Sequence, residues 1–129
     1  ADAAYAQALE VWEPLQHPNR YEAVAGRGLT AWRLGHRAEA LALAEEAIAF
    51  VQTEGMVGIV EPALLLLNCH RVFAEAGEKK RADWSLQRAV DWVETIAGRI
   101  SDEAMAAAFR NRPDNQIVAR LWAVQTANG

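Results

Sequence analysis

The residue types that most often bind metals or act as nucleophiles are sparse in this sequence. Its single cysteine, Cys69, is followed directly by His70, and the other histidines are His17 and His36. Adjacent helix residues point in different directions, and no second Cys or His has ligand spacing, so no metal site is predicted. We expect Cys69 to be a buried thiol beside a packed or hydrogen-bonded imidazole, because free cysteine behaves as a small apolar residue. No cofactor is predicted.

Two pairs of adjacent acids, Glu45–Glu46 and Asp102–Glu103, are the remaining candidates for acid–base chemistry. Catalysis requires convergent groups with shifted pKa values, and neither pair has a nucleophile or base at a suitable spacing. The first pair is better explained as a solvated helix face. The second suits a first helical turn, where negative charge meets the helix dipole favourably. No catalytic residue and no phosphate loop of the Gly-x-x-x-x-Gly-Lys type is found, so an enzyme is not expected.

The densest positive charge is the run Lys79–Lys80–Arg81, with Arg88 two turns further on. Acids at positions 75, 78 and 83 interrupt this cluster, which favours an exposed helix beginning over a phosphate-binding patch. The chain carries 13 basic and 17 acidic residues, a formal net charge of -4. Nucleic-acid-binding surfaces concentrate positive charge, so direct nucleic-acid binding is not expected.

Composition favours helices and one folding unit. Of the 129 residues, 52% are apolar, and alanine and leucine dominate while β-branched residues are few. This balance predicts an all-α fold with a sizeable core. The longest apolar run, Ala63–Leu67, is far shorter than the roughly 20 residues that span a bilayer, so no membrane association is expected. A lone cysteine and no secretory leader predict a reducing, cytoplasmic location.

The sequence repeats itself with a shift of 42 residues, which places Gly35 on Gly77 at the end of a first helix. Small residues then recur where two helices would cross, and large apolar residues recur on the buried stripe. The other matched pairs are Val24–Ala25 with Leu66–Leu67, Ala31 with Phe73, Ala40 with Ala82, Ala47–Ile48 with Ala89–Val90, and Phe50–Val51 with Trp92–Val93.

Local signals predict where the helices begin and end. Prolines at 18, 62 and 113 suit first turns, and Ser101 suits an N-terminal cap. About seven helices are predicted, near residues 2–15, 18–34, 37–54, 59–76, 78–98, 102–110 and 113–125.

The predicted helices form a single domain that begins in the middle of a repeat. Because repeats bury their apolar faces only by stacking, this start predicts that the chain was cut from a longer protein. The expected divisions are a half repeat at 1–17, repeats at 18–57 and 58–98, and C-terminal capping helices at 99–129.

The small and apolar residues at the matched positions resemble the tetratricopeptide repeat. Its pattern is met by Gly28, Gly35, Ala40 and Ala47 in the first repeat and by Phe73, Gly77, Ala82 and Ala89 in the second. His70 stands where the family has a small residue, and both repeats exceed the family's usual length, which implies longer helices. The resemblance implies antiparallel helical hairpins stacked as a right-handed superhelix, an α-α solenoid.

The C-terminal stretch is similar to the end of the helical arrays in large bacterial signalling ATPases. Those proteins include ATP-dependent transcription activators of the maltose-regulator kind and multidomain nucleotide cyclases. The similarity implies a sensor or interaction role, while the catalytic and DNA-binding modules of such proteins lie elsewhere. It is carried by Arg99-Ile100-Ser101-Asp102-Glu103, Phe109, Asn111, Pro113, Asn115 and Trp122.

Projection of the tetratricopeptide pattern places one face of each repeat's first helix toward a concave groove. Trp32 with an arginine has the makeup of an interface hot spot, although tryptophan fills cores equally well. The predicted groove residues are Glu22, Leu29, Trp32 and Arg33 of the first repeat, and Leu64, Asn68, Arg71 and Glu75 of the second.

Three functions remain open. The first, favoured by the lack of catalytic groups, is an interaction or sensing module. Its groove would bind a protein or peptide partner, or another domain of the parent chain. The second is an effector domain that encloses a small molecule in a pocket. The third is a structural spacer, whose exposed array ends would let isolated chains form a homodimer.

Overall fold

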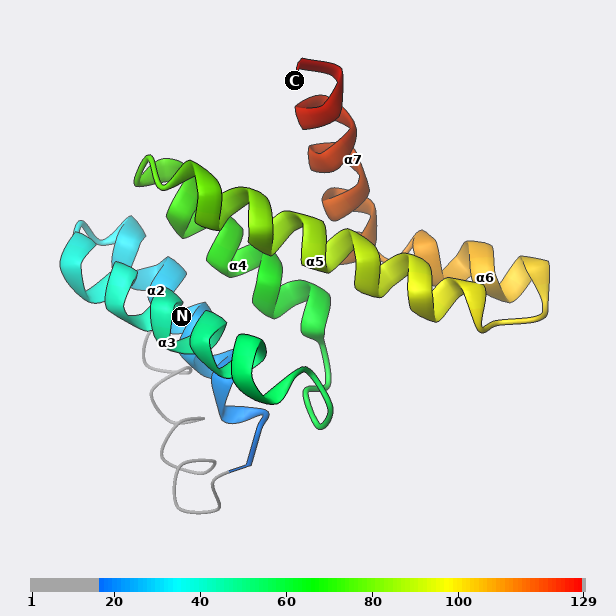
Figure 1. Cartoon of the computed structure of the whole chain (residues 1–129), viewed down its shortest axis with the longest axis horizontal. Coiled ribbons are helices and arrows are strands. Elements are labelled where there is room, and N and C mark those ends of the chain that lie inside the picture. Colours follow the sequence, from blue (N-terminus) through cyan, green and yellow to red (C-terminus); the bar gives the residue numbers. More distant parts are fainter. Residues whose placement is uncertain (1–16, 129) are drawn as a thin grey trace.

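The structure is a computed structural model that describes residues 17–128, and these residues form α-helices without any strand. The all-α prediction is confirmed for this part of the chain, whereas the helix predicted at 2–15 lies outside the described residues. No helix within them combines the length and apolar character needed to cross a bilayer. The described helices are α2 (Arg20–Arg33), α3 (Arg37–Glu54), α4 (Pro62–Glu75), α5 (Lys79–Gly98), α6 (Glu103–Arg110) and α7 (Pro113–Asn128) (Figure 1).

The two matched helix pairs, α2 with α3 and α4 with α5, are joined by turns of the same geometry. Gly35 has φ 85° and Gly77 has φ 80°, a left-handed conformation that glycine adopts without a steric cost. After the first of these glycines, the His36 N–H donates to the Ala31 carbonyl at 2.9 Å, and the second turn repeats this bond at the same length. This pattern satisfies the last helix carbonyls, so the predicted glycine ends are confirmed.

Two predicted helix beginnings are wrong for local reasons. α4 starts at Pro62 and not near 59, because the residue before a proline is disfavoured from the helical conformation. Glu61 accordingly has φ -127° and ψ 75°. At α6 the cap is Asp102 and not Ser101, since the Asp102 carboxylate accepts a hydrogen bond from the Met105 N–H at 2.9 Å. α2 also begins two residues later than predicted.

Small residues let α2 and α3 approach closely. A Cβ atom on Gly28 would lie 3.3 Å from the Leu43 Cβ and 3.4 Å from the Ala40 carbonyl oxygen. Ala40 and Ala44 on the facing side of α3 are fully buried. The second pair has the large core residue Phe73, fully buried at the end of α4. The repeated apolar pattern therefore forms one continuous core through both pairs.

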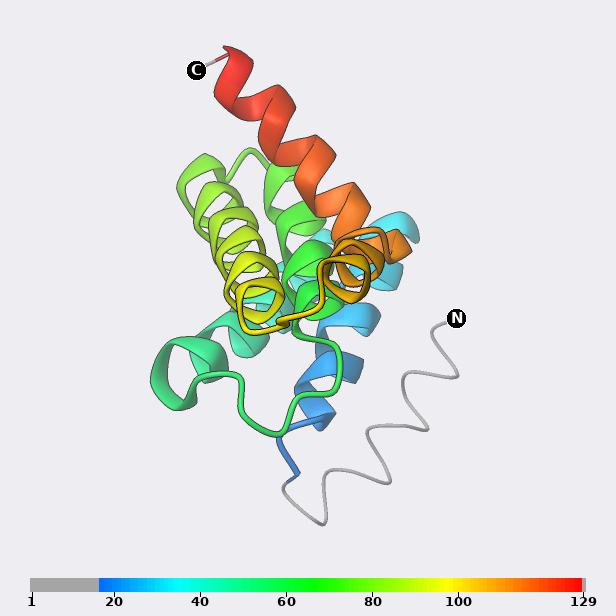
Figure 2. The same ribbon diagram turned by 90° about the vertical axis from the view of Figure 1, so that its right-hand side faces the viewer.

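The arrangement of the helices puts α4 at the centre. α4 packs against both helices of the first pair, and α7 packs against both α4 and α5, while α6 lies along the end of α5 (Figures 1 and 2). The start of α7 meets the start of α4, and Leu121 further along α7 meets Ala74 near the end of α4. α4 and α7 therefore run in the same direction. α2, α4 and α7 lie side by side in that order.

Candidate binding groove between three helices

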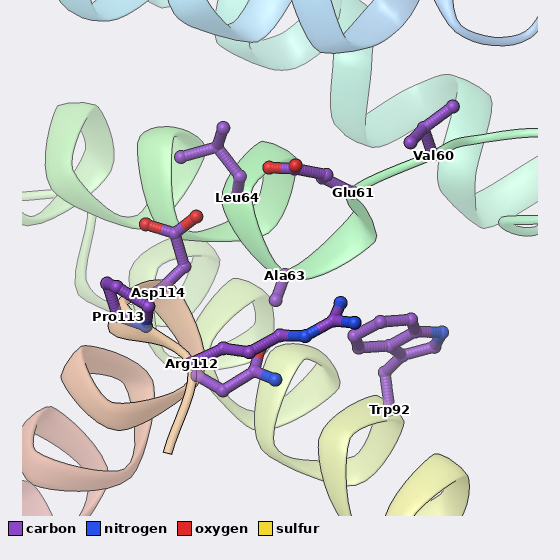
Figure 3. A pocket seen from close by; sticks show the side chains of 9 residues that line it. Val60, Glu61, Ala63, Leu64, Trp92, Arg112, Pro113 and Asp114 are labelled. Atoms are coloured by element: carbon purple, nitrogen blue, oxygen red, sulfur yellow. The ribbon is translucent and has the colours of Figure 1, made fainter. Parts of the chain in front are cut away.

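Two hollows lie along α4 and α7, the first bordered also by α5 and the second by α2, and together we call them the groove. The first hollow, of about 280 Å³, lies at the starts of α4 and α7 (Figure 3). The second, of about 320 Å³, lies where α2 and α4 end. The first is lined by Val60, Glu61, Ala63, Leu64, Trp92, Arg112, Pro113, Asp114 and Asn115, and the second by Leu29, Arg33, His70, Arg71, Ala74, Glu75, Ile117 and Leu121.

Most of the predicted groove residues lie at these hollows. The second hollow is lined by four of them, and the first is lined by Leu64. Asn68 lies on the same face of α4, one turn from Leu64 and one turn from Arg71. Glu22 lies close enough to Glu61 at the first hollow for their charges to interact.

Trp32 lies apart from the other predicted groove residues. Like Glu22 and Asn68 it lines neither hollow, and its ring packs against the core beside the turn between α2 and α3. The Arg37 guanidinium lies 5.2 Å from its ring centroid, a cation–π arrangement at the start of α3. In the described part of the chain, the tryptophan and the groove arginines are therefore not brought together.

Two carboxylates line the first hollow and a third, on α2, lies near enough for its charge to interact with theirs, and we call the three the acidic end. They are Glu22 of α2, Glu61 before α4 and Asp114 of α7, and none forms an ion pair with a described residue. The pKa of the Glu22 carboxyl is raised from 4.5 to about 7. Burial is the main cause and repulsion by Glu61 and Asp114 adds to it, while a hydrogen bond from the Glu61 backbone opposes the rise.

Replacement of Glu22 by glutamine should stabilise the fold at alkaline pH. The folded chain holds the Glu22 proton more tightly than the unfolded chain between pH 4.5 and about 7, so stability falls as the pH rises through that window. The whole shift corresponds to about 3 kcal/mol, which solvent screening of this half-buried group reduces to about 1 kcal/mol. Urea unfolding of Glu22→Gln at pH 8 should show that gain, and at pH 4 it should show none.

A matched variant separates the causes of the Glu22 shift. Asp114→Asn removes one repelling charge and keeps the burial of Glu22, so it should give a smaller gain at pH 8 than Glu22→Gln. Identical pH profiles for Glu22→Gln and the unmutated chain would contradict this account of the acidic end.

Two arginines, which we call the basic end, border the second hollow. Arg33 ends α2 and is exposed, whereas Arg71 on α4 is half-buried. Neither forms an ion pair with any residue between 17 and 128. His70 on the same wall donates its Nδ1–H to the Ala82 carbonyl at 2.8 Å, which leaves Nε2 as an acceptor when the ring is neutral. The hollow thus offers positive charge beside the apolar side chains of α7.

Asn68 lies between the two ends and is the one buried polar side chain of the described residues without a hydrogen bond. It is only 4% exposed. The other two buried polar residues are satisfied, because the Ser85 hydroxyl donates to the Arg81 carbonyl and the Asn115 amide donates to the Phe109 carbonyl, both at 2.8 Å. Its amide atoms are not among the fully buried polar atoms that lack a partner, so they reach solvent and are open to a ligand.

Several charges elsewhere on the described surface form ion pairs. Lys79 contacts Asp83 at 3.1 Å, Arg20 contacts Glu46 at 3.5 Å, and Arg81 pairs with Glu45. The basic run at the start of α5 is thus the exposed helix beginning that its interrupting acids predicted. Glu45 and Glu46 form the expected solvated helix face.

The adjacent Cys69 and His70 have the structural roles expected of them. The Cys69 thiol is fully buried, with its Sγ 3.9 Å from the Ala44 carbonyl oxygen, and burial raises its pKa. A thiol that stays protonated is a poor nucleophile. Among residues 17–128, no cluster of three His, Cys, Asp or Glu side chains is placed to hold a metal ion.

The sequence did not indicate that α7 lines the second hollow. Ile117 and Leu121, which line it, are spaced as one face of a helix, and this spacing was the available signal. The helix that carries them was expected only to cap the array. Glu61 and Asp114 are 53 residues apart, and only the packing of α7 on α4 brings them together.

No family model, curated protein or solved structure matches this chain. What the groove does is therefore judged from its own residues, since a helical fold alone does not determine a function.

Proposed function

We propose that this chain is a tetratricopeptide-like interaction module that binds an extended segment of a partner protein in the groove. The repeat-array part of the proposal is supported by two helix pairs with the same glycine turn 42 residues apart. It is also supported by the packing of α2, the first helix of the first pair, against α4, the first helix of the second pair, and of α4 against α7. In a parent protein of the kind that the C-terminal stretch resembles, a bacterial signalling ATPase or nucleotide cyclase, such a module would serve sensing or transcription control.

The unpaired amide of Asn68 is the observation that carries the peptide-binding proposal. A side-chain amide offers two N–H donors and a carbonyl acceptor, and an extended peptide backbone presents the complementary groups. The amide atoms of Asn68 are not among the fully buried polar atoms that lack a partner, so water reaches them in the free chain. A ligand backbone that pairs with Asn68 would take the place of that water.

A small-molecule effector fits the groove less well than a peptide. Ligand pockets usually have volumes of about 300 to 1,000 Å³ and cover most of the ligand. Each hollow here is near the lower limit, and Arg33 and Glu75 at the second hollow are exposed. An extended peptide that spans both hollows fills both volumes, and it does not need the hollows to be closed at their ends. A structural spacer would have no use for an unpaired Asn68.

Replacement of Asn68 by leucine should separate binding from stability. The variant should bind members of an immobilised octapeptide library at least about tenfold more weakly than the unmutated chain, because the backbone hydrogen bonds are lost. Its free energy of unfolding should stay within about 1 kcal/mol of that of the unmutated chain, because Asn68 forms no hydrogen bond with a described residue whose loss would destabilise the fold. Binding is measured by fluorescence anisotropy and stability by urea unfolding.

Asn115→Leu is the matched control for that experiment. Asn115 is as buried as Asn68, but its amide donates to the Phe109 carbonyl, so its replacement should lower stability by about 1 to 2 kcal/mol. The proposal is wrong if no library peptide binds the unmutated chain, or if Asn68→Leu binds them equally well.

A further inference from the structure

Acidic and basic side chains lie at opposite ends of the groove. At the acidic end, Glu61 and Asp114 line the first hollow and Glu22 lies within electrostatic reach of both, while at the basic end Arg33 and Arg71 line the second hollow. None of these five groups forms an ion pair with a described residue, although ion pairs occur on the rest of the described surface. Asn68, buried and without a hydrogen bond, lies between the two ends on the face of α4 that both hollows share.

Two charged residues depart from this sorting. Arg112 lines the first hollow, but its guanidinium lies 5.2 Å from the Phe109 ring centroid and beside Trp92, across the hollow from the Glu61 and Asp114 carboxylates (Figure 3). Glu75 lines the second hollow but is exposed and forms no ion pair with a described residue. Each end thus contains one charge of the opposite sign, which is outnumbered by the other charges at that end. The first end stays net negative and the second stays net positive.

The length of α4 sets the spacing between the two ends. Glu61 and Arg71 are ten residues apart in the sequence, which is about 15 Å along a helix. An extended peptide rises by about 3.3 Å per residue, so about four to five residues cover that distance. Side chains four positions apart lie on the same face of an extended chain. A peptide can therefore present one charge to each end at once.

We propose that the partner segment is an extended peptide of another protein, with a lysine or arginine over the acidic end and, four positions away, an aspartate or glutamate over the basic end. This inference rests on the proposed peptide-binding function and adds the charge pattern of the ligand. The middle residue of the segment faces the region between the hollows, where the Asn68 amide pairs with its backbone. Charge complementarity of this kind sets specificity and register.

The test uses fluorescein-labelled octapeptide libraries with randomised neutral positions and three charge patterns. One set has a lysine and a glutamate four positions apart, the second has them adjacent, and the third has glutamine at both positions. The unmutated chain should bind the first set at least about tenfold more tightly than the other two at low salt, with the difference shrinking as salt is added.

A double substitution at the basic end locates the recognition. Arg33→Glu with Arg71→Glu should bind the first set at least about tenfold more weakly, and should lose the preference for that set over the glutamine set. The matched control is Lys80→Glu with Arg99→Glu, two exposed positions outside both hollows, which should bind as the unmutated chain does. Circular dichroism checks that the helices of both variants are intact.

The outcomes distinguish this inference from the proposed function. Peptide binding that is lost in Asn68→Leu but is the same for all three charge patterns would overturn the charge inference and leave the groove as a peptide site. Selection of the first set that survives the double substitution at the basic end would also overturn it. Failure of every library to bind would overturn both the inference and the proposed function.

Discussion

Replacement of Phe73 by alanine should lower the free energy of unfolding by about 3 to 5 kcal/mol. Phe73 is fully buried at the end of α4, and its removal leaves a cavity that close-packed neighbours fill only partly. Because α4 packs against four other described helices, this loss should weaken the whole domain and with it the groove. Urea unfolding followed by circular dichroism at 222 nm measures the change.

Phe50→Ala is the control for the Phe73 substitution. Phe50 is half-buried on α3, where its ring stacks on Tyr21 with centroids 4.0 Å apart. Part of its surface already faces solvent, so the substitution should cost about 1 to 2 kcal/mol, clearly less than at Phe73. An equal loss of unfolding free energy at the two positions would contradict the argument that the deeper burial of Phe73 sets its larger contribution.

Replacement of Gly28 by leucine should destabilise the fold by about 3 kcal/mol. The added Cβ alone would lie 3.3 Å from the Leu43 Cβ and 3.4 Å from the Ala40 carbonyl oxygen, and the rest of the side chain has no room between α2 and α3. The Ala40 contact is with backbone, which cannot rotate away as a side chain can, so the two helices must separate. Thermal and urea unfolding of the variant should both show the loss.

The same substitution at Gly98 tests whether the effect at Gly28 comes from packing. Gly28 lies inside α2, whereas Gly98 is the last residue of α5, and a Cβ there would meet no atom within 4 Å. Gly98→Leu should therefore raise stability slightly, by about 0.5 to 1 kcal/mol, because glycine is a poor helix former. Destabilisation by both substitutions would show that the close approach at Gly28 is not the cause.

Half of the predicted groove residues lie together in the structure, and their role in binding stays a prediction. The tetratricopeptide pattern projected Leu29, Arg33, Arg71 and Glu75 toward one surface, and all four line the second hollow. Their shared position has a simple basis, because residues three or four apart share one helix face wherever the helix is placed. Trp32 shows the limit of the method: its side chain packs at the turn between α2 and α3. Projecting a repeat pattern onto a helix predicts which side of the helix a residue lies on, but not which other elements pack against that side.

What the sequence by itself determined was the all-α class of the described residues and most of the helix boundaries. These features depend on interactions within a few residues: the left-handed glycines 35 and 77, the prolines at helix starts, and the spacing of apolar side chains. Even the one misplaced cap was a local choice, between Ser101 and Asp102.

Only the tertiary structure decided what the groove contains. α7, which was predicted as a C-terminal capping helix, packs on α4 and α5 and so forms a wall of the groove, which brings the charge of Asp114 near those of Glu22 and Glu61. That packing depends on how side-chain volumes on separate helices fit together, which no short-range pattern encodes. The raised pKa of Glu22 has the same origin, since burial and charges brought from α4 and α7 cause it.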